Sequence, residues 1–352
     1  MKRLLDNLYR KAKKAPQRII YPESTEPRIL KAVYQAAKKG ICNPILLGTE
    51  QAILKAVKKH NLSVSFFQKH TTIINPQQEQ PLQVFFAKTL YKLRKKKGLS
   101  KQQAQQLVKD PMYFATLLVY FGEADGIISG ATHTTSHTFK PALQLLRKNK
   151  SHHMSSFFLM EHTDGFYLFA DCAVTIQPTP QQLAHIAVST AESAKSLFKL
   201  PANIAMLSFS THGSNTHPLA LTMKKATQLT RQLVKRKKMK QVVVDGELQA
   251  DAAVIPAIHK IKVGTTHNLP GPHLQGKANI LIFPNLEAAN IAYKLVEWLG
   301  HYAAIGPITQ GLGAAVNDLS RGCTIQDIVD VTAITVVQAQ QYAKGNKGGK
   351  KS

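Results

Sequence analysis

Near the C-terminal end of the chain, two adjacent side chains could stabilise an oxyanion, and a carboxylate follows them. Ser320 and Arg321 are neighbours in a glycine-containing turn, and Asp327 comes seven residues after Ser320. A serine offers an oxyanion its hydroxyl and its N–H, and the arginine guanidinium offers a rigid pair of donors that matches phosphate. If the segment is helical, Asp327 lies close to two turns beyond Ser320, where its carboxylate could serve the same site.

Asp327 also fits a purely structural role. Thr324 and Asp327 have the spacing of a capping box, with Thr324 at the N-cap of a helix and Asp327 at its third position. The two roles do not exclude each other, because a carboxylate at a helix start can also face a ligand.

Two further loops that are rich in Ser, Thr and Gly follow apolar runs of strand length. The first begins at Ser129 and adds Thr132, Thr135 and Lys140 as candidate phosphate ligands. Small residues let backbone N–H groups approach a ligand, a helix N-terminus attracts anions, and a lysine adds a point charge. We expect Pro141 in the first turn of the helix that follows. The alternative for this loop is a Ser/Thr-rich helix cap.

The second of these loops, residues 208–215, holds the candidate binding residues Ser210 and Thr211. It could bind an anion or a polar amide chain. A simple turn explains the same pattern equally well.

Histidines and cysteines form no pattern that predicts a metal site or a disulfide framework. His133 and His137 are four residues apart, but no suitably spaced acidic ligand accompanies them, so we expect no metal. The three cysteines, Cys42, Cys172 and Cys323, are far apart and odd in number, which favours a reducing cytoplasm. Nothing near Cys323 in the sequence would activate its thiol, so we interpret it as a small buried residue.

Apolar runs of strand length alternate with helical patterns along most of the chain. The runs are continuous, which is typical of strands covered on both faces in a mostly parallel α/β sheet. In such sheets ligands bind beyond the carboxyl ends of the strands, so the loops there are the sites of interest. The expected strands are Arg18–Pro22, Asn43–Gly48, Ala124–Gly130, Ile204–Phe209, Gln241–Val244 and Asn279–Phe283, and the expected first helix is Arg28–Lys39.

The length of 352 residues suits two domains with separate cores. No apolar run predicts a membrane span, and the N-terminus lacks the apolar region of a signal peptide. The net charge of +26, from 46 Lys and Arg against 20 Asp and Glu, favours anionic ligands. Because no nucleic-acid-binding motif accompanies short basic runs such as Lys92–Lys97 and Lys235–Lys240, we interpret the charge mainly as a solvated surface.

Eight sequence blocks, taken in order, carry a family resemblance. They are Tyr21–Arg28, Leu93–Gly98, Ala124–Ala131, Phe169–Asp171, Met206–Thr211, Asp245–Ala253, Ile305–Pro307 and Asn317–Gly322. Each block alone is weak, but the ordered set is highly specific. It resembles the phosphate acetyltransferase family (phosphotransacetylases), which also includes phosphate butyryltransferases, from about Arg18 to about Gln341.

The resemblance implies an α/β fold of two α/β domains with mostly parallel sheets and an inter-domain cleft, similar to isocitrate and isopropylmalate dehydrogenases. We expect residues 1–150, completed by 310–343, to form one domain and residues 151–309 to form the other. We expect a disordered basic tail over 344–352 and a surface loop at Pro270–His273. The resemblance also implies a homodimer.

The same resemblance implies a reversible transfer of an acetyl group between phosphate and coenzyme A. The thiol of coenzyme A, which is a co-substrate and not a permanently bound cofactor, would attack acetyl phosphate in a ternary complex without a covalent acyl-enzyme. Asp327 would take the thiol proton, and Ser320 would stabilise the tetrahedral intermediate. Arg321 would bind the phosphoryl or carbonyl oxygen, and Arg94 would help to hold the phosphate.

The chain departs from the family pattern at a few positions. Lys140 stands where an arginine is usual, so the charge is kept but the bidentate fork is lost. Trp298 stands where some members have another arginine, Asn285 replaces the usual Asp, and Ala314 and Ala315 replace a Lys-Pro pair. These changes bear on phosphate binding and acyl specificity, and they leave the catalytic candidates intact.

Three functions remain open. The favoured one is phosphate acetyltransferase, with coenzyme A, acetyl-CoA, acetyl phosphate and inorganic phosphate as partners in the cytoplasm. The second is phosphate butyryltransferase, which runs the same chemistry on a longer acyl group. The third is a weakly active family member that binds nucleic acid or another anion through its charge. We favour the first, and expect neither a membrane nor a nucleic-acid partner.

Overall fold

The computed structural model describes residues 4–147, 153–163, 165–263 and 274–347. The chain divides into two compact units. The central unit is Lys150–Gly311, and the terminal unit is Lys2–Asn149 together with Leu312–Ser352. The segment Pro270–His273, expected to be a surface loop, lies outside the described residues.

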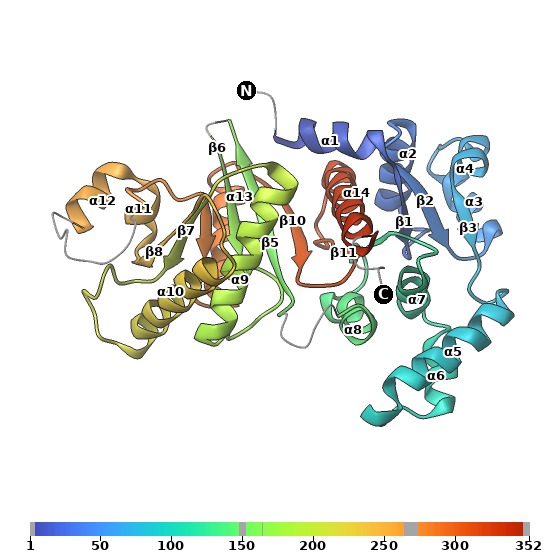
Figure 1. Ribbon diagram of the computed structural model, residues 1–352. Helices are drawn as coiled ribbons and strands as arrows, with labels where there is room; N and C mark the ends of the chain where they lie inside the picture. The colour runs from blue at the N-terminus through green and yellow to red at the C-terminus, as the bar shows by residue number, and fades with distance from the viewer. Residues whose placement is uncertain (1–3, 148–152, 164, 264–273, 348–352) are drawn as a thin grey trace. The chain divides into compact units, whose positions relative to one another are not determined.

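The terminal unit is built on a five-stranded sheet in the order β11-β4-β1-β2-β3 within the described ranges (Figure 1). Every neighbouring pair of strands is parallel. All residues of β4 and β11 are buried, which explains why these strands have no polar alternation in sequence. The strands are β1 (Gln17–Tyr21), β2 (Cys42–Leu47), β3 (Thr72–Ile74), β4 (Gly126–Ser129) and β11 (Ala315–Asp318).

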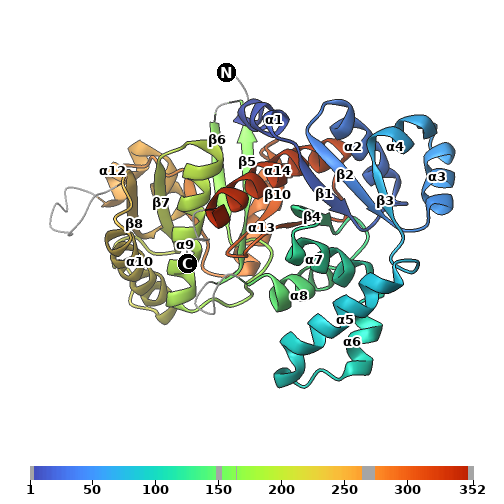
Figure 2. The same cartoon turned by 45° about the vertical axis from the view of Figure 1, so that its right-hand side comes forward.

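Helix α14 (Ile325–Lys347) brings the C-terminal part of the chain into the terminal unit. It packs against helix α2 and strands β1, β4 and β11, and Figure 2 shows it beside β1 and α2. Residues 328–339 are all buried, as expected of a core helix that is covered all round. The other helices of this unit are α1 (Leu4–Lys14), α2 (Pro27–Lys38), α3 (Glu50–Lys59), α4 (Val64–His70), α5 (Gln80–Arg94), η1 (Lys95–Lys97), α6 (Lys101–Leu107), α7 (Pro111–Phe121) and α8 (Thr135–Leu145).

The central unit contains a mixed sheet in the order β10-β5-β6-β9-β7-β8. Strands β6, β9, β7 and β8 are parallel, whereas β10, β5 and β6 are antiparallel neighbours. The apolar runs in the sequence did not predict this antiparallel edge. The strands are β5 (Ser155–His162), β6 (Gly165–Ala170), β7 (Ala202–Leu207), β8 (Val242–Leu248), β9 (Ile280–Ile282) and β10 (Ala303–Gln310).

Helices cover the central sheet and close its core. Helix α13 contacts β5, β6 and β10, and its buried Tyr293 stacks on Phe158 with ring centroids 4.2 Å apart. Helices α9 and α10 pack on each other, and α10 also contacts β8. The helices of this unit are α9 (Pro180–Ser193), η2 (Ala194–Phe198), α10 (Pro218–Arg236), α11 (Ala250–Val254), α12 (Pro256–Val263) and α13 (Leu286–Trp298).

Two sequence expectations about helix ends are wrong. Helix α8 begins at Thr135, because the Thr134 side chain accepts a hydrogen bond from the N–H of His137, and Pro141 therefore lies inside the helix instead of in its first turn. The expected disordered tail begins at residue 344, yet α14 continues to Lys347. Residues 348–352 lie outside the described residues.

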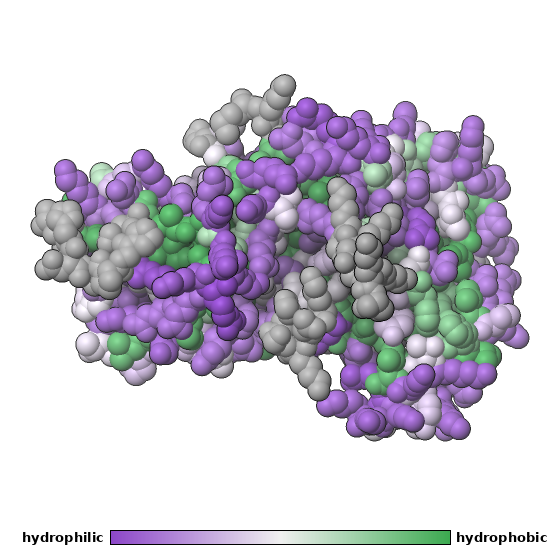
Figure 3. Space-filling model, viewed as in Figure 1, coloured by the Kyte–Doolittle hydropathy of each residue, from purple (hydrophilic) through white to green (hydrophobic). Residues whose placement is uncertain are grey.

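No helix within the described ranges combines the length and the apolarity that a membrane crossing needs. On the face shown in Figure 3, hydrophilic side chains predominate, with a hydrophobic area over α5 and α7. Exposed side chains of those two helices include Val84, Phe85 and Tyr120.

Candidate active site

The loop after β4 folds around a buried carboxylate of its own chain. The backbone N–H groups of residues 130–133 all donate to the two carboxylate oxygens of Glu23, over 2.8–3.0 Å. The hydroxyl of Thr132 donates to Glu23 at 2.8 Å, and His133 Nδ1 lies 2.8 Å from the same oxygen. Burial raises the pKa of Glu23, but the hydrogen bonds, those from Thr132 foremost, bring it below its ordinary value.

This arrangement corrects one expectation about the loop. We expected its backbone N–H groups to be open to a substrate anion, and Glu23 uses four of them. The Thr132 hydroxyl is likewise engaged as a donor. The anion that this loop holds in the structure is therefore an internal one, and it shapes the loop.

Arg28 joins this loop to the Ser320–Arg321 turn. One terminal nitrogen of its guanidinium donates to the carbonyl oxygens of Arg321 at 2.7 Å and Cys323 at 3.2 Å. The other donates to the carbonyl oxygen of Ala131 at 2.9 Å. A single planar side chain thus fixes the spacing of two loops that lie about 190 residues apart in sequence.

The ends of β4 and β11 lie directly side by side. Ser129 and Asp318 are register partners, and both are buried. The Thr135 hydroxyl, at the start of α8, donates to Asp318 Oδ2 at 2.7 Å. Gly130 has a φ of +113°, and a Cβ there would collide with Asp318 Oδ1 and the backbone of Leu319, so no larger residue fits.

Asp318 differs from Glu23 in that its pKa is raised and not lowered. Burial raises its pKa to about 6, although the hydrogen bond from Thr135 acts in the opposite direction. Its partner Ser129 is fully buried, and the Ser129 hydroxyl has no hydrogen-bond partner within the described residues. Both side chains are therefore buried beneath the loops that follow β4 and β11.

The Ser320–Arg321 turn presents its two side chains differently. Ser320 is half-buried, and its Oγ accepts the N–H of Gly322 at 3.3 Å. Arg321 is exposed. Cys323 is buried at the base of the turn, and burial raises the pKa of its thiol to about 11, so it remains protonated at neutral pH. This fits its interpretation as a small buried residue.

The capping box at the start of α14 is present. The Thr324 hydroxyl accepts the N–H of Asp327 at 3.2 Å, and Asp327 Oδ2 accepts the N–H of Thr324 at 2.8 Å. The helix begins at Ile325, so the segment from Ser320 is a turn, and the helical spacing considered for Ser320 and Asp327 does not apply. The side chain of Asp327 is half-buried, and the described contacts engage only one of its two oxygens.

Arg94 and Lys140 line one open pocket of about 630 Å³. Arg94 ends α5, and Lys140 is exposed on α8. Lys97 contributes a third cation, and among the described residues no acidic side chain lines the pocket. The structure therefore brings two of the residues that were singled out as phosphate ligands to one cationic surface.

Ser210 and Thr211 belong to the central unit, where they close the loop after β7. The Ser210 hydroxyl donates to the Glu247 carboxylate at 3.2 Å, and the Thr211 hydroxyl donates to the Gln249 side chain at 3.3 Å. Both residues are buried. The N–H of Gly213 also donates to Glu247, at 2.5 Å, so a buried carboxylate organises this loop as Glu23 organises the other.

The two histidines of the β4–α8 loop are held by carboxylates. His133 and His137 stack with ring centroids 4.6 Å apart, and His137 Nε2 lies 2.8 Å from Asp110. His133 contacts Glu23 through Nδ1. Within the described ranges no group of three or more His, Cys, Asp or Glu side chains is arranged to hold a metal ion.

The structure thus gathers most of the candidates of the terminal unit on adjacent loops. Thr135, Ser320 and Arg321 follow the carboxyl ends of the parallel neighbours β4 and β11, and Asp327 opens the next helix. The residues that hold these loops, Glu23, Arg28 and Asp318, were not among the candidates. Glu23 and Arg28 both lie in the block Tyr21–Arg28 that carries the family resemblance, and this is the sequence feature that could have pointed to them.

A parallel sheet with polar loops at its carboxyl edge defines an open α/β protein whose ligand site lies beyond the strand ends. Comparison with known proteins indicates which family within this class the chain resembles. Residues 3–336 match the phosphate acetyl/butaryl transferase family. A phosphate acetyltransferase of Thermoanaerobacterium thermosaccharolyticum is 42% identical over 344 residues, which is 96% of this chain and 99% of that protein. One of Acetivibrio thermocellus is 40% identical over 347 residues, 97% of this chain and 99% of that protein.

Solved structures agree with these relatives. A phosphotransacetylase of Streptococcus pyogenes has a TM-score of 0.84 at 37% identity, covering 96% of this chain and 98% of that one. The EutD phosphotransacetylase of Staphylococcus aureus has a TM-score of 0.83 at 39% identity, with the same coverage. The chain belongs to the phosphate acetyl/butaryl transferase family, which is a family of acyltransferases.

Proposed function

We propose that this protein is a phosphate acetyltransferase, which reversibly transfers an acetyl group between phosphate and coenzyme A. The observation that carries the proposal is the turn after β11. It presents the Ser320 hydroxyl, the exposed Arg321 guanidinium and, at the start of α14, an Asp327 carboxylate with one oxygen outside the capping box. The full-length similarity to relatives named phosphate acetyltransferase supports the choice of reaction.

The proposed reaction needs a base, an oxyanion site and a phosphate site. Coenzyme A carries a thiol, whose pKa of roughly 8.5 leaves it mostly protonated at neutral pH. In the proposal Asp327 accepts the thiol proton while the sulfur attacks the carbonyl carbon of acetyl phosphate. Formation of the C–S bond gives a tetrahedral intermediate. The bond from the carbonyl carbon to the phosphate oxygen then breaks, and acetyl-CoA and phosphate are released.

We assign different side chains to the oxyanion and to the phosphate group. Ser320 and Arg321 are proposed to donate to the carbonyl oxygen as it becomes negative, and such a contact is worth roughly 2–4 kcal/mol in the transition state. Arg94 and Lys140 share a cationic pocket free of lining carboxylates, which supports a role in holding phosphate groups. The cysteines take no part, since burial raises the thiol pKa of each of the three. As the family resemblance implies, we propose direct attack by the thiol of coenzyme A, without a covalent acyl-enzyme.

The remaining candidates are assigned more limited roles. Thr135 is exposed but its hydroxyl proton is donated to Asp318, so we propose that it orients the loop and could contact a substrate only as a hydrogen-bond acceptor. Ser129, Ser210 and Thr211 are buried, and Thr132 donates to Glu23. We propose that these four maintain the shape of the binding loops.

The choice between acetyl and longer acyl groups rests on the relatives. Each of the relatives described above that carries a substrate name is a phosphate acetyltransferase, and this favours acetyl over butyryl. One extra methylene in a pocket changes specificity by only about 1–3 kcal/mol, so a preference is expected rather than strict exclusion. The rates with acetyl phosphate and butyryl phosphate compare the two directly.

We also propose a homodimer in the cytoplasm. Helix α13 carries Ile291, Leu295 and Trp298 on one apolar face, Leu299 follows as its C-cap, and Trp298 and Leu299 are 73% and 76% exposed. An apolar helix face of this kind is costly in water and supports burial against a second copy. Trp298 would then serve the interface at the position where some relatives have arginine.

The decisive experiment is the formation of acetyl-CoA from acetyl phosphate and coenzyme A by the purified protein, followed by ultraviolet absorbance of the thioester. The proposal expects turnover that requires both substrates and decreases with butyryl phosphate. Folded protein without turnover on either acyl phosphate would exclude the acyltransferase proposal. Duplex DNA binding with a steep salt dependence, in the absence of turnover, would favour the anion-binding alternative.

A further inference from the structure

A second pocket lies between helices α5 and α6 of the terminal unit. Its volume is about 850 Å³, within the range of roughly 300–1,000 Å³ that is usual for small-molecule sites. Helix α6 is short but well defined, since Ser100 and Gln103 form a complete capping box at its start. Ala104 and Leu90 are buried where the two helices meet. The pocket therefore lies between two packed helices, of which α6 is capped at its start.

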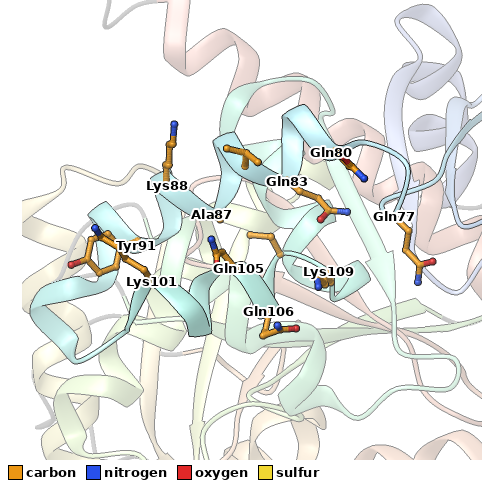
Figure 4. Close-up of a pocket in the computed structure, with 12 residues that line it drawn as sticks. Gln77, Gln80, Gln83, Ala87, Lys88, Tyr91, Lys101, Gln105, Gln106 and Lys109 are labelled. Carbon is orange, nitrogen blue, oxygen red and sulfur yellow. The ribbon is translucent and has the colours of Figure 1, made fainter.

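The lining of the pocket combines three kinds of chemistry. Five glutamines supply paired amide donors and acceptors: Gln77, Gln80, Gln83, Gln105 and Gln106. Val84, Ala87, Val108 and the ring of Tyr91 supply an apolar surface, and Val84 is 55% exposed to solvent there. Figure 4 shows Gln105 pointing between the two helices, with Tyr91 and Lys101 together at one end and Lys109 toward the other.

The charges of the pocket are all of one sign. Lys88, Lys101 and Lys109 line it, and no described acidic side chain does. None of the three forms an ion pair within the described residues. Lys101 Nζ instead lies 5.9 Å from the centre of the Tyr91 ring. Unneutralised ammonium groups around one cavity favour a multiply charged anion.

We infer that this pocket is a second ligand site, and that it binds a nucleotide. Aromatic and apolar surface suits a stacked base, since every base offers a π face. Side-chain amides pair with the donor and acceptor edges of a base, as glutamine does with adenine. Lysines at the ends of the pocket suit phosphate groups as point charges.

The site is separate from the one proposed for acyl transfer. None of Ser320, Arg321 and Asp327 lines it, and it shares only Gln106 with the pocket of Arg94 and Lys140. A free nucleotide is nonetheless chemically related to the adenosine phosphate part of coenzyme A. The test must therefore distinguish a nucleotide in this pocket from a nucleotide in the acyl-transfer site.

Isothermal titration calorimetry with ATP tests the inference on the intact protein. We expect one ATP per chain, and we expect saturating coenzyme A to leave that binding in place. Inorganic tripolyphosphate should bind at least about tenfold more weakly than ATP, because it cannot stack or pair with the amides. Substitution of Gln105→Ala should weaken ATP and leave tripolyphosphate unchanged.

Charge variants supply the matched control. Lys101→Glu combined with Lys109→Glu should weaken ATP by about a hundredfold, since two carboxylates then replace two ammonium groups around a cavity proposed to hold a polyanion. Lys55→Glu combined with Lys69→Glu makes the same change in net charge at exposed positions of the same unit, outside the pocket, and should leave ATP affinity within about threefold. All four positions lie outside the proposed acyl-transfer machinery, so acetyl transfer without ATP should be unchanged.

Three results would overturn the inference. In the first, coenzyme A removes ATP binding while the pocket variants bind ATP normally, which assigns ATP to the acyl-transfer site. In the second, both double variants weaken ATP equally, which reduces the effect to the overall charge. In the third, ATP does not bind at millimolar concentration to folded protein.

Discussion

At the scale of single residues, Asp327 carries the sharpest question, because it has both a structural contact and a proposed catalytic role. Asp327→Asn keeps an oxygen that can accept the N–H of Thr324 but removes the base. We expect it to melt within a few degrees of wild type and to lose at least about a hundredfold in kcat. Circular dichroism melting and the thioester assay measure the two effects.

Thr324→Ala is the matched control for this prediction. It removes the hydroxyl that accepts the N–H of Asp327, yet leaves the carboxylate in place. Loss of an N-cap hydroxyl costs about 1 kcal/mol in the free energy of unfolding, so stability should decrease while most of kcat remains. Full activity of Asp327→Asn would leave Asp327 with a capping role only.

At the scale of secondary-structure elements, Glu23 determines the shape of the β4–α8 loop. Glu23→Gln replaces one acceptor oxygen by an NH₂ group that faces backbone donors. Leaving such donors unpaired costs roughly 2–4 kcal/mol of the free energy of unfolding at pH 7. Urea unfolding at pH 7 measures the loss, and a variant as stable as wild type would contradict the assignment.

The pH dependence of this effect has a definite sign. The pKa of Glu23 is lowered in the folded protein, so its stabilising contribution is complete above the unfolded pKa and is lost as pH falls through the folded value. The difference in stability between wild type and Glu23→Gln should therefore be largest at neutral pH and should shrink below about pH 4.

Asp318, at the end of β11, should show the opposite pH dependence. Burial raises its pKa to about 6, so its protonated form favours the folded state. That contribution is present below the unfolded pKa of about 3.9 and is lost as pH rises through about 6. Asp318→Asn cannot ionise, so it should not lose this stability, and its free energy of unfolding should rise relative to wild type between pH 4 and pH 7. Unfolding curves collected across that pH range measure the difference. An unchanged difference across the range would show that Asp318 does not titrate there.

At the scale of the whole molecule, the net charge of +26 should assist the capture of anionic substrates. We expect kcat/KM for coenzyme A to fall severalfold when salt is raised from about 0.05 M to about 0.5 M, because the Debye length shrinks. The value of kcat should change much less. A kcat/KM that does not respond to salt would mean that the charge has no part in substrate encounter.

The proposed dimer is a second prediction at this scale. Trp298→Glu combined with Leu295→Glu places two carboxylates on the exposed apolar face of α13. If this face is the interface, sedimentation should show monomers for the variant and dimers for wild type. Because both side chains point into solvent, the central unit should still fold. Dimers in both proteins would place the interface elsewhere.

Much of the fold was predictable from local pattern. Buried parallel strands such as β1, β2 and β4 appear in sequence as continuous apolar runs, and Thr324 with Asp327 shows the spacing of a capping box. The antiparallel pair β5 and β6 was not identified, because buried runs look alike whichever way they pair. The extent of α14 was missed because its basic end lacks an apolar period.

The sequence by itself indicated the family, singled out Ser320, Arg321 and Asp327 as candidates, and predicted Cys323 as a small buried residue. Each depends on residue types and short spacings, which are properties of the chain alone. Only the tertiary structure decided how the loops are held. Glu23 and Arg28 lie more than a hundred residues from the loops that they bind. A buried carboxylate and a guanidinium meet these partners only once the sheet has folded. A local sequence pattern cannot predict contacts between residues so far apart in the chain.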